Sequence, residues 1–366
     1  MSDQITPILM PKWGLSMKEG KLAAWHVSEG TMISPGDEIM DVETDKIANA
    51  VEAADGGLLR RRIGQEGETY LVRALLAVMA PESVSDAEID AYVSAFAVPV
   101  SEDAEDSGPR YELAELDIGR IRYVARQGTG TPVILIHGFG GDLDNWLFNI
   151  DALAEAAPVY ALDLPGHGQS VKAVANPGLG TMVSTLIAFM DHLGVDKSHL
   201  VGHSMGGLIA GQTAIDHPAR VASVNLICSA GLGDEINGGY INGFVAAPGR
   251  KELKPVLGDL FFDQNLVSRA MIDDLLKYKR LDGVQTFLGA LAANLFANGK
   301  QAAQIAKALG SASMPCQTIW GASDAIIPAS HAGAIPGARS TVIDGAGHMV
   351  QMEQAARVND LIKAQL

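Results

Sequence analysis

Three residues far apart in the sequence have the types and the order of a nucleophilic catalytic triad. Ser204 lies in the motif Gly-His-Ser-Met-Gly, which follows an apolar run and precedes a helical pattern. A serine on such a strand-to-helix turn projects from the edge of a sheet, and small neighbours let the chain turn sharply. Because a serine hydroxyl is a poor nucleophile without a base, Ser204 needs a histidine elsewhere in the chain.

The partners of such a serine are expected downstream, first an acid and then a histidine. Asp324 follows a strand-like run in Thr-Ile-Trp-Gly-Ala-Ser-Asp, and His348 follows the last such run in Gly-Ala-Gly-His. We predict that His348 accepts the serine proton and that Asp324 orients and stabilises the resulting imidazolium. The competing acids Asp163, Asp234 and Asp344 fit the expected loop positions less well.

A further motif, His-Gly-Phe-Gly-Gly, follows the apolar run at 132–136 and predicts an oxyanion-binding loop. The backbone N–H groups of Phe139 and Met205 are predicted to bind the oxygen that becomes negative during acyl transfer. His137, which begins the motif, is more typical of a structural histidine at a tight turn than of a proton carrier. The segment 163–168, Asp-Leu-Pro-Gly-His-Gly, is typical of a structural loop at the rim of a site.

The pattern from Tyr111 onward indicates how these residues are positioned. Strand-like runs end at residues 136, 163, 202, 229, 321 and 344, with helical patterns between them and a last one over Gln351–Leu366. This alternation predicts a mostly parallel sheet covered by helices on both faces. Residues 232–312 interrupt it with extra helical patterns, including Met271–Tyr278 and Leu288–Leu309, and predict a helical lid above the sheet.

These motifs resemble the α/β-hydrolase family over residues 111–366. The matching segments are HGFGG, DLPGHGQS, GHSMGG, GASDAIIP and GAGHMVQME, and they occur in the family's order. The resemblance implies an α/β-hydrolase catalytic domain with a serine nucleophile. It does not identify a substrate, because this fold hosts esterases, thioesterases, C–C hydrolases and acyltransferases.

Residues 1–80 have an all-β pattern instead. Short apolar runs are separated by Gly-rich or acidic turns. A weak internal repeat is also present, since Glu-Gly pairs occur at 29–30 and 66–67, at similar places in the two halves. The pattern predicts a small sandwich built from two related hairpin sets. The predicted strands are Ile8–Met10, Gly20–His26, Glu38–Val42, Gly57–Arg62 and Leu75–Met79.

Lys46 lies between two of these strands, in Asp-Val-Glu-Thr-Asp-Lys-Ile, where a lysine is ordinarily a solvated turn residue. The segment Met-Pro-Lys-Trp-Gly-Leu-Ser-Met at 10–17 and the Glu-Gly pairs change this interpretation. With them, residues 5–80 resemble the lipoyl domains of 2-oxoacid dehydrogenase acyltransferases. The resemblance implies that Lys46 carries lipoate and that Asp45 and Ile47 help a lipoate-attaching enzyme recognise the turn. The Met-Lys-Met signature of biotinyl domains is absent.

Residues 81–110 join the two regions and are strongly acidic. They contain eight acids and one base, so their net charge is 1 − 8 = −7. A short helix is predicted around Ala87–Phe96. The remainder is rich in Ala, Pro, Ser, Glu and Asp, which bury too little surface to order themselves, and it predicts a linker.

The overall composition excludes several classes of protein. A formal net charge of −16 argues against a nucleic-acid partner, which requires a basic surface. No apolar run approaches the length of a membrane helix, and the N-terminus lacks a secretory pattern. Cys228 and Cys316 lie in apolar runs and are predicted to be buried thiols rather than a disulfide framework, which favours a reducing cytoplasmic location. No metal site is predicted.

A lipoyl domain followed by an α/β-hydrolase domain resembles the E2 subunits of acetoin dehydrogenase complexes. The peripheral-subunit-binding domain and the catalytic His-x-x-x-Asp-Gly motif of other E2 subunits are not evident. The resemblance implies transfer of acetyl from the lipoyl arm on Lys46 to coenzyme A through acyl-Ser204. It also implies a thiamine-diphosphate E1 and a dihydrolipoamide dehydrogenase E3 as partners, and we expect a homo-oligomer.

Two other functions remain open from the sequence. The first is a hydrolase, either a thioesterase or a C–C bond hydrolase, fused to a lipoyl domain; it would use the same triad. The second is a lipoyl carrier and scaffold subunit with an idle hydrolase-like domain. The presence of Ser204, Asp324 and His348 together argues against an idle domain.

Overall fold

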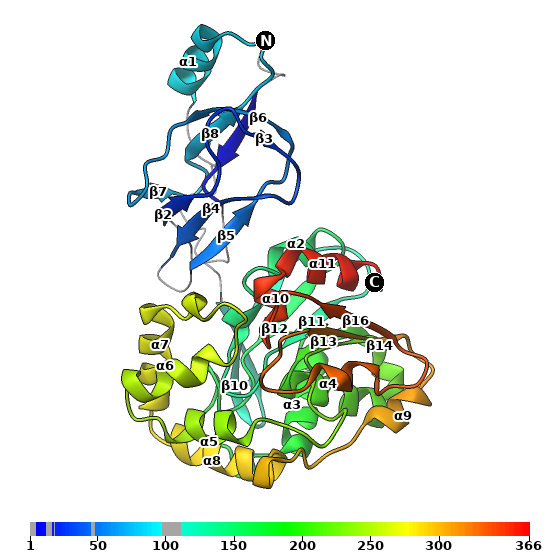
Figure 1. The fold of residues 1–366 in the computed structure, drawn as a ribbon. Coiled ribbons are helices and arrows are strands. Elements are labelled where there is room, and N and C mark those ends of the chain that lie inside the picture. The colour runs from blue at the N-terminus through cyan, green and yellow to red at the C-terminus, as the bar shows by residue number, and fades with distance from the viewer. Residues whose placement is uncertain (1–4, 12–16, 18, 45–47, 97–110) are drawn as a thin grey trace. The chain divides into compact units, whose positions relative to one another are not determined.

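The computed structural model of the protein divides into two compact units, Met1–Pro109 and Arg110–Leu366 (Figure 1). The structure describes residues 5–11, 17, 19–44, 48–96 and 111–366. The first unit is a small β domain, and the second is an α/β domain, as the sequence patterns predict. No helix in the described ranges is both long and apolar enough to cross a membrane.

The N-terminal unit contains two four-stranded sheets with the orders β1-β8-β6-β3 and β5-β4-β2-β7. Alternating side chains fill its core, and Leu22, Met40 and Leu59 are fully buried. Three strands were not predicted, because β3 and β7 are very short and β5 has the weakly apolar sequence Ala-Asn-Ala-Val-Glu. The strands are β1 (Thr6–Leu9), β2 (Glu19–Trp25), β3 (Met32–Ile33), β4 (Glu38–Glu43), β5 (Ala48–Glu52), β6 (Gly57–Arg62), β7 (Thr69–Leu71) and β8 (Leu75–Met79).

The strands β4 and β5 are antiparallel neighbours, and Glu43 is opposite Ala48 in their register. The four residues that connect them in the sequence include Lys46, with its neighbours Asp45 and Ile47. These three residues lie outside the described ranges. The two strands that flank them therefore form a hairpin whose connection contains the lysine predicted to carry lipoate.

A helix, α1 (Asp86–Ala95), packs on the N-terminal unit beyond the predicted end of the β domain. It begins with a capping box in which Ser85 and Glu88 satisfy each other's backbone N–H groups. Ile89 is fully buried in a cluster with residues of β8, and Arg60 donates hydrogen bonds to the carbonyls of Pro81 and Val84. The first half of the acidic segment is therefore part of this unit's packing.

The C-terminal unit is built on an eight-stranded sheet with the order β16-β15-β14-β13-β11-β12-β10-β9. The six predicted strands are present and parallel, whereas β9 and β10 form an antiparallel hairpin at one edge that the sequence patterns did not predict. The strands are β9 (Tyr111–Leu116), β10 (Gly119–Arg126), β11 (Val133–Ile136), β12 (Val159–Leu162), β13 (Ser198–His203), β14 (Val221–Ile227), β15 (Cys316–Gly321) and β16 (Arg339–Ile343).

Helices cover this sheet on both faces (Figure 1). The pair α3 (Leu179–His192) and α4 (Met205–Asp216) packs together, as do α2 (Ile150–Ala154) and α11 (Ala355–Lys363). The single helix predicted over Gln351–Leu366 is wrong. The chain forms α10 (Val350–Glu353) and then α11, because Gln354 leaves helical geometry with φ −130° and ψ 47°.

The predicted lid contains four main helices, α5 (Gly238–Ala246), α6 (Arg250–Gly258), α7 (Arg269–Lys279) and α8 (Val284–Leu295). The helical pattern over Leu288–Leu309 is not one helix. It ends at Leu295 and resumes as α9 (Ala306–Gly310), because Asn298 and Gly299 adopt left-handed φ values of 57° and 68°. Buried Gln301 joins the two ends of the lid: it accepts a hydrogen bond from Gly231 N–H and donates one to Glu235 O.

We predict that Ile89→Ala destabilises the N-terminal unit by about 2–5 kcal/mol, the usual cost of such a cavity. Hydrogen exchange of the β8 amides in the full chain measures the effect, because β8 packs directly under α1. Ser94→Ala on the exposed side of α1 is the matched control and should leave this exchange unchanged. Equal exchange in the two variants would show that α1 does not stabilise the domain.

Candidate active site

Ser204 lies between β13 and α4 in a strained backbone conformation, with φ 54° and ψ −116°. Few non-glycine residues adopt a positive φ, so the surrounding structure must hold this one in place. Ser204 N–H donates to Ile227 O at 2.9 Å, and Ser204 O accepts from Ala230 N–H at 3.0 Å. The end of the neighbouring strand β14 therefore holds the turn from both sides.

Glycines make this turn possible because the chain approaches itself closely. A Cβ on Gly202 would lie 2.2 Å from Gly206 O, and one on Gly206 would lie 2.1 Å from Ile136 O. Gly138 of the His-Gly-Phe-Gly-Gly loop also approaches the turn, since its Cβ would lie 3.1 Å from the Cβ of Ser204. The two motifs that the sequence singled out are thus in direct contact.

His348 and Asp324 form the pair expected of a general base and its orienting acid. His348 Nδ1 lies 2.8 Å from Asp324 Oδ2, and both side chains are almost completely buried. The other oxygen, Asp324 Oδ1, accepts hydrogen bonds from the N–H groups of Ile326 and Ile327 at 2.8 and 3.0 Å. This bonding fixes the carboxylate, places a proton on Nδ1 and leaves the lone pair of Nε2 available as a base.

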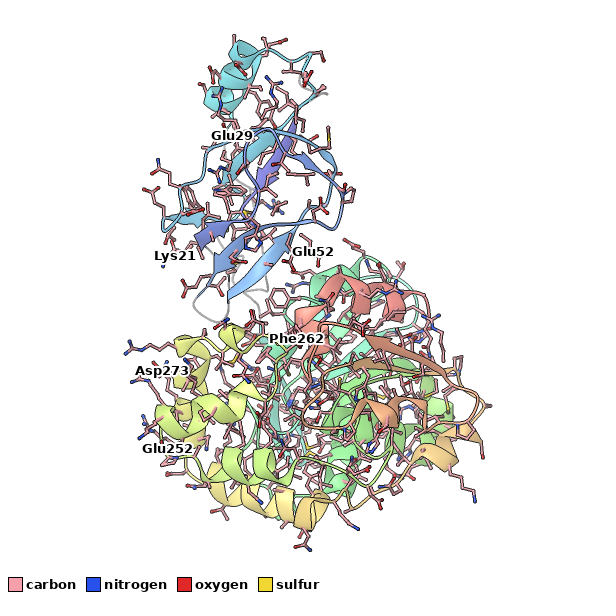
Figure 2. The ribbon with its side chains drawn as sticks, viewed as in Figure 1. Lys21, Glu29, Glu52, Glu252, Phe262 and Asp273 are labelled. Carbon is pink, nitrogen blue, oxygen red and sulfur yellow. The ribbon has the colours of Figure 1, made fainter. Side chains whose placement is uncertain are left out.

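Two residues that the sequence analysis did not assign hold His348 in place. The ring of His203 donates from Nε2 to His348 O at 2.9 Å, and the two ring centroids are 4.7 Å apart. Glu353 accepts from Gly347 N–H at 2.7 Å and from Phe262 N–H at 2.6 Å. Glu353 therefore ties the histidine loop to the lid segment around Phe262, which is labelled in Figure 2.

The N–H groups of Phe139 and Met205 fit the predicted oxyanion role. Within the described ranges, neither group donates a hydrogen bond. Met205 is the first residue of α4, so its N–H lies at the positive end of the helix dipole. The side chain of Phe139 packs on the lid, with its ring centroid 5.9 Å from that of Phe244 and 6.0 Å from that of Phe296.

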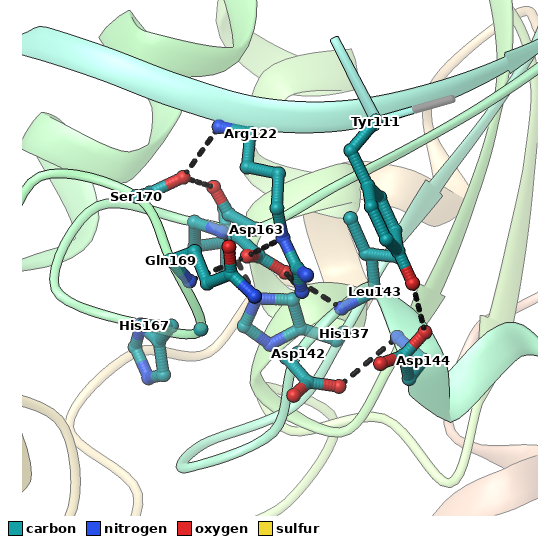
Figure 3. A network of polar contacts seen from close by, with 12 residues as sticks. Tyr111, Arg122, His137, Asp142, Leu143, Asp144, Asp163, His167, Gln169 and Ser170 are labelled. Carbon is teal, nitrogen blue, oxygen red and sulfur yellow. Dashed lines mark hydrogen bonds and ion pairs between the residues drawn. The ribbon is translucent and has the colours of Figure 1, made fainter. Parts of the chain in front are cut away.

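A buried ion pair lies in the loop that the sequence predicts at the rim of the site, and Figure 3 shows its network of polar contacts. Arg122 Nε donates to Asp163 Oδ2 at 2.6 Å, and the carboxylate also accepts from the N–H groups of Leu143 and Gln169. His137 accepts from Leu164 N–H at Nε2, and burial lowers its pKa. Asp163 is thus bonded to Arg122, whereas the acid bonded to the His348 ring is Asp324.

The other competing acids and the cysteines are also accounted for. Asp234 and Asp344 are not buried, and neither is the hydrogen-bond partner of His348. Both cysteines are free; Cys228 is fully buried and Cys316 only partly so. Burial raises the pKa of the Cys228 thiol well above its usual value, so Cys228 remains protonated beside the Asp324–His348 pair.

Comparison with known proteins places both units in known families. Residues 131–355 match the family described as alpha/beta hydrolase fold, and residues 6–79 match the biotin/lipoyl family described as biotin-requiring enzyme. The chain is 53% identical to the dihydrolipoyllysine-residue acetyltransferase component of the acetoin cleaving system of Cupriavidus necator. This match covers 100% of the chain and 98% of the relative. The protein of the same name from Pseudomonas putida is 48% identical over 99% of the chain and 98% of its own length.

The chain belongs to this family of acetyltransferase components. The family predicted from the two resemblances is therefore confirmed. The C-terminal unit of this acetyltransferase component also has the fold of solved hydrolases. A meta-cleavage product hydrolase from Pseudomonas fluorescens superposes with a TM-score of 0.63 at 25% identity, over 69% of this chain and 96% of the hydrolase.

We predict that acid destabilises the acetyltransferase's C-terminal unit through three buried histidines. Burial lowers the pKa of His137, His167 and His203, so they stay neutral when folded but bind protons below about pH 6.5 when unfolded. The unfolded state then binds more protons. The free energy of unfolding therefore decreases as the pH is lowered, by up to ~1.4 kcal/mol per pH unit for each histidine.

Urea unfolding between pH 5 and 7.5 measures this slope. His167→Gln should reduce the number of protons taken up on unfolding by about one, and so make stability less dependent on pH. The same change at exposed His192 should not alter this dependence. A slope that is the same in both variants would rule out burial of His167 as a cause of the acid sensitivity.

We also predict that Glu353→Gln slows the reaction of Ser204 with a fluorophosphonate about tenfold. An amide accepts only one of the two N–H bonds that the carboxylate accepts, so the loop carrying His348 loses a charge-assisted bond. The labelling rate across pH distinguishes positioning from global unfolding, because only a displaced base changes its profile in a folded protein. Glu155→Gln, at an exposed carboxylate, is the control. Equal rates in the two variants would contradict the prediction.

Proposed function

We propose that this protein is the acetyltransferase of an acetoin-cleaving complex and transfers acetyl from a lipoyl thioester to coenzyme A through acyl-Ser204. The observation that carries the proposal is the pairing of domains in one chain. One chain combines a strained serine and a buried His348–Asp324 pair with a biotin/lipoyl-type domain. The whole-length relatives, which are named as acetyltransferase components of acetoin cleaving systems, support it.

The chemistry of the first half-reaction follows from the site. A lipoyl group on Lys46 supplies the acetyl thioester. His348 Nε2 takes the proton of Ser204 Oγ as that oxygen bonds to the thioester carbon. The N–H groups of Phe139 and Met205 stabilise the oxyanion, the carbon–sulfur bond breaks, and His348 donates its proton to the departing sulfur.

The second half-reaction uses the same groups in reverse. His348 Nε2 accepts the proton of the coenzyme A thiol, and the thiolate bonds to the carbon of acetyl-Ser204. The bond between this carbon and Ser204 Oγ breaks, and His348 returns the proton to that oxygen. One thioester replaces another, so the reaction is nearly balanced in energy, and the enzyme must mainly keep water from the acyl-serine.

The hairpin of β4 and β5 is the part of the N-terminal unit that supports attachment of lipoate to Lys46. The register of these strands leaves only a short connection between Glu43 and Ala48, which suits a lysine at a hairpin tip. A lipoate-attaching enzyme would modify Lys46. An E1 that depends on thiamine diphosphate would load the arm, and a dihydrolipoamide dehydrogenase E3 would reoxidise it, in a complex built on a homo-oligomer of this chain.

The decisive test measures acetyl-coenzyme A and free acetate together, with S-acetyl-dihydrolipoamide as donor. We expect mainly acetyl-coenzyme A from the wild type and a loss of roughly a thousandfold or more in Ser204→Ala. Intact mass should show one acetyl group on Ser204 when coenzyme A is withheld. Lys46→Arg should retain activity with this free donor but lose turnover in the assembled complex.

Other results would identify the alternatives. Production of acetate alone would identify a hydrolase, whose catalytic residues would be the same. Full turnover of the complex by Ser204→Ala would identify a carrier subunit with an idle domain. Full turnover by Lys46→Arg would rule out the swinging-arm role of this lysine.

A further inference from the structure

The lid contains a cavity that the proposed mechanism does not use. It has a volume of about 410 Å³ and lies between the start of α6 and the C-terminal half of α7. Its lining residues are Gly249, Arg250, Asp273, Leu276, Lys277 and Arg280. Figure 2 shows Asp273 on α7 and Glu252 on α6 at the outer side of the lid.

The lining of this cavity is cationic, although the chain as a whole carries a net charge of −16. Three cations face one carboxylate. Arg250 is paired with Asp273, with Nη2 2.7 Å from Oδ2, and Lys277 Nζ lies 2.7 Å from Asp274 Oδ1. Arg250 and Lys277 are thus each neutralised by a carboxylate, whereas within the described part of the chain the guanidinium of Arg280 forms no ion pair and is left to bind an anion.

Gly249 is the N-cap of the nine-residue helix α6, and the carboxylate of Glu252 from the first turn lies beside this N-terminus. The N-terminus of α6 is therefore already matched by a negative charge, and the ligand's phosphates are left to the side chains of the cavity. Buried Leu276 provides an apolar wall beside the charges. This combination suits a ligand with both phosphate groups and an apolar or heterocyclic part.

A chain of contacts connects this part of the lid with the oxyanion loop. Lys279, next to Arg280, donates hydrogen bonds from its buried Nζ to the carbonyls of Phe244 and Ala247, the latter at 2.7 Å. The ring of Phe244 in turn packs on Phe139, with centroids 5.9 Å apart. The helix that carries two of the cavity's cations is therefore braced against the loop that lies beside Ser204.

We propose that this cavity binds the phosphate-bearing nucleotide end of coenzyme A while its thiol end reaches Ser204. The inference rests on the proposed acetyl transfer and adds the place where the acceptor is recognised. Guanidinium groups bind phosphate oxygens through paired, charge-assisted hydrogen bonds, which favours Arg280 and Arg250 as the contacts. Binding of the nucleotide in this cavity favours coenzyme A over water as the acceptor, because water has no group that the cavity can bind.

An acidic protein surface is a different occupant for the same charges. The concave shape and the apolar wall of Leu276 favour a small ligand over a protein face. The test therefore separates the two occupants.

The test compares Arg280→Gln with Arg269→Gln, which changes an exposed arginine of α7 that does not line the cavity. The full lipoylated chain is assayed with coenzyme A and with pantetheine, which lacks the nucleotide. Arg280→Gln should raise KM for coenzyme A about tenfold and leave kcat and the KM for pantetheine unchanged. Arg269→Gln should leave all three values unchanged.

Three results would overturn the proposal. The first is an unchanged KM for coenzyme A in Arg280→Gln. The second is an equal rise for pantetheine, which would indicate general damage to the site. The third is a loss confined to acetyl delivered on the arm at Lys46, which would identify an acidic protein surface as the occupant.

A binding measurement keeps this proposal separate from the proposed function. Calorimetry with adenosine 3′,5′-diphosphate requires no acetyl transfer, and we expect binding to the wild type that is lost in Arg280→Gln. If the wild type transfers acetyl to neither thiol yet shows this binding, the transferase proposal fails and the cavity remains a nucleotide site. If acetyl transfer proceeds but the nucleotide binds equally to both proteins, the cavity proposal alone fails.

Discussion

The left-handed backbone of Ser204 is the constraint on which the active site depends. A φ of 54° is strained for a serine. Hydrogen bonds to Ile227 O and from Ala230 N–H hold the turn in this conformation. Those bonds require β14 to end beside β13, and the approach of α4 requires Gly202 and Gly206. The parallel sheet is therefore the element that fixes the direction of one hydroxyl.

The remaining site residues depend on the same edge of the sheet. Because β11, β13, β14, β15 and β16 are parallel, their C-terminal ends bring together loops that are far apart in the sequence. The Asp324–His348 pair arises there from the ends of β15 and β16. Its orientation comes from groups outside the triad, since His203 holds the backbone of His348 and Glu353 anchors the loop before it.

Local motifs allowed much of this site to be predicted from the sequence. The turn at Ser204 and the pair of His348 with Asp324 depend on short segments whose glycines and neighbouring strands fix their geometry. The role of Glu353 was not predictable in this way, because its partner Phe262 lies 91 positions away. The β9–β10 hairpin was missed for a similar reason: its polar sequence, Tyr-Glu-Leu-Ala-Glu-Leu, is stabilised by its place at the sheet edge.

The contacts between lid and core explain how one fold can serve a transferase. A hydrolase and an acyltransferase share the acyl-serine and differ in the nucleophile that reaches it. Here the lid packs directly on the core loops: a Cβ on Gly140 would lie 2.4 Å from the Phe244 ring, and one on Gly166 would lie 2.2 Å from that of Phe287. In the proposed mechanism, the selection of a thiol over water is therefore assigned to the lid, whereas the triad supplies the chemistry common to both reactions.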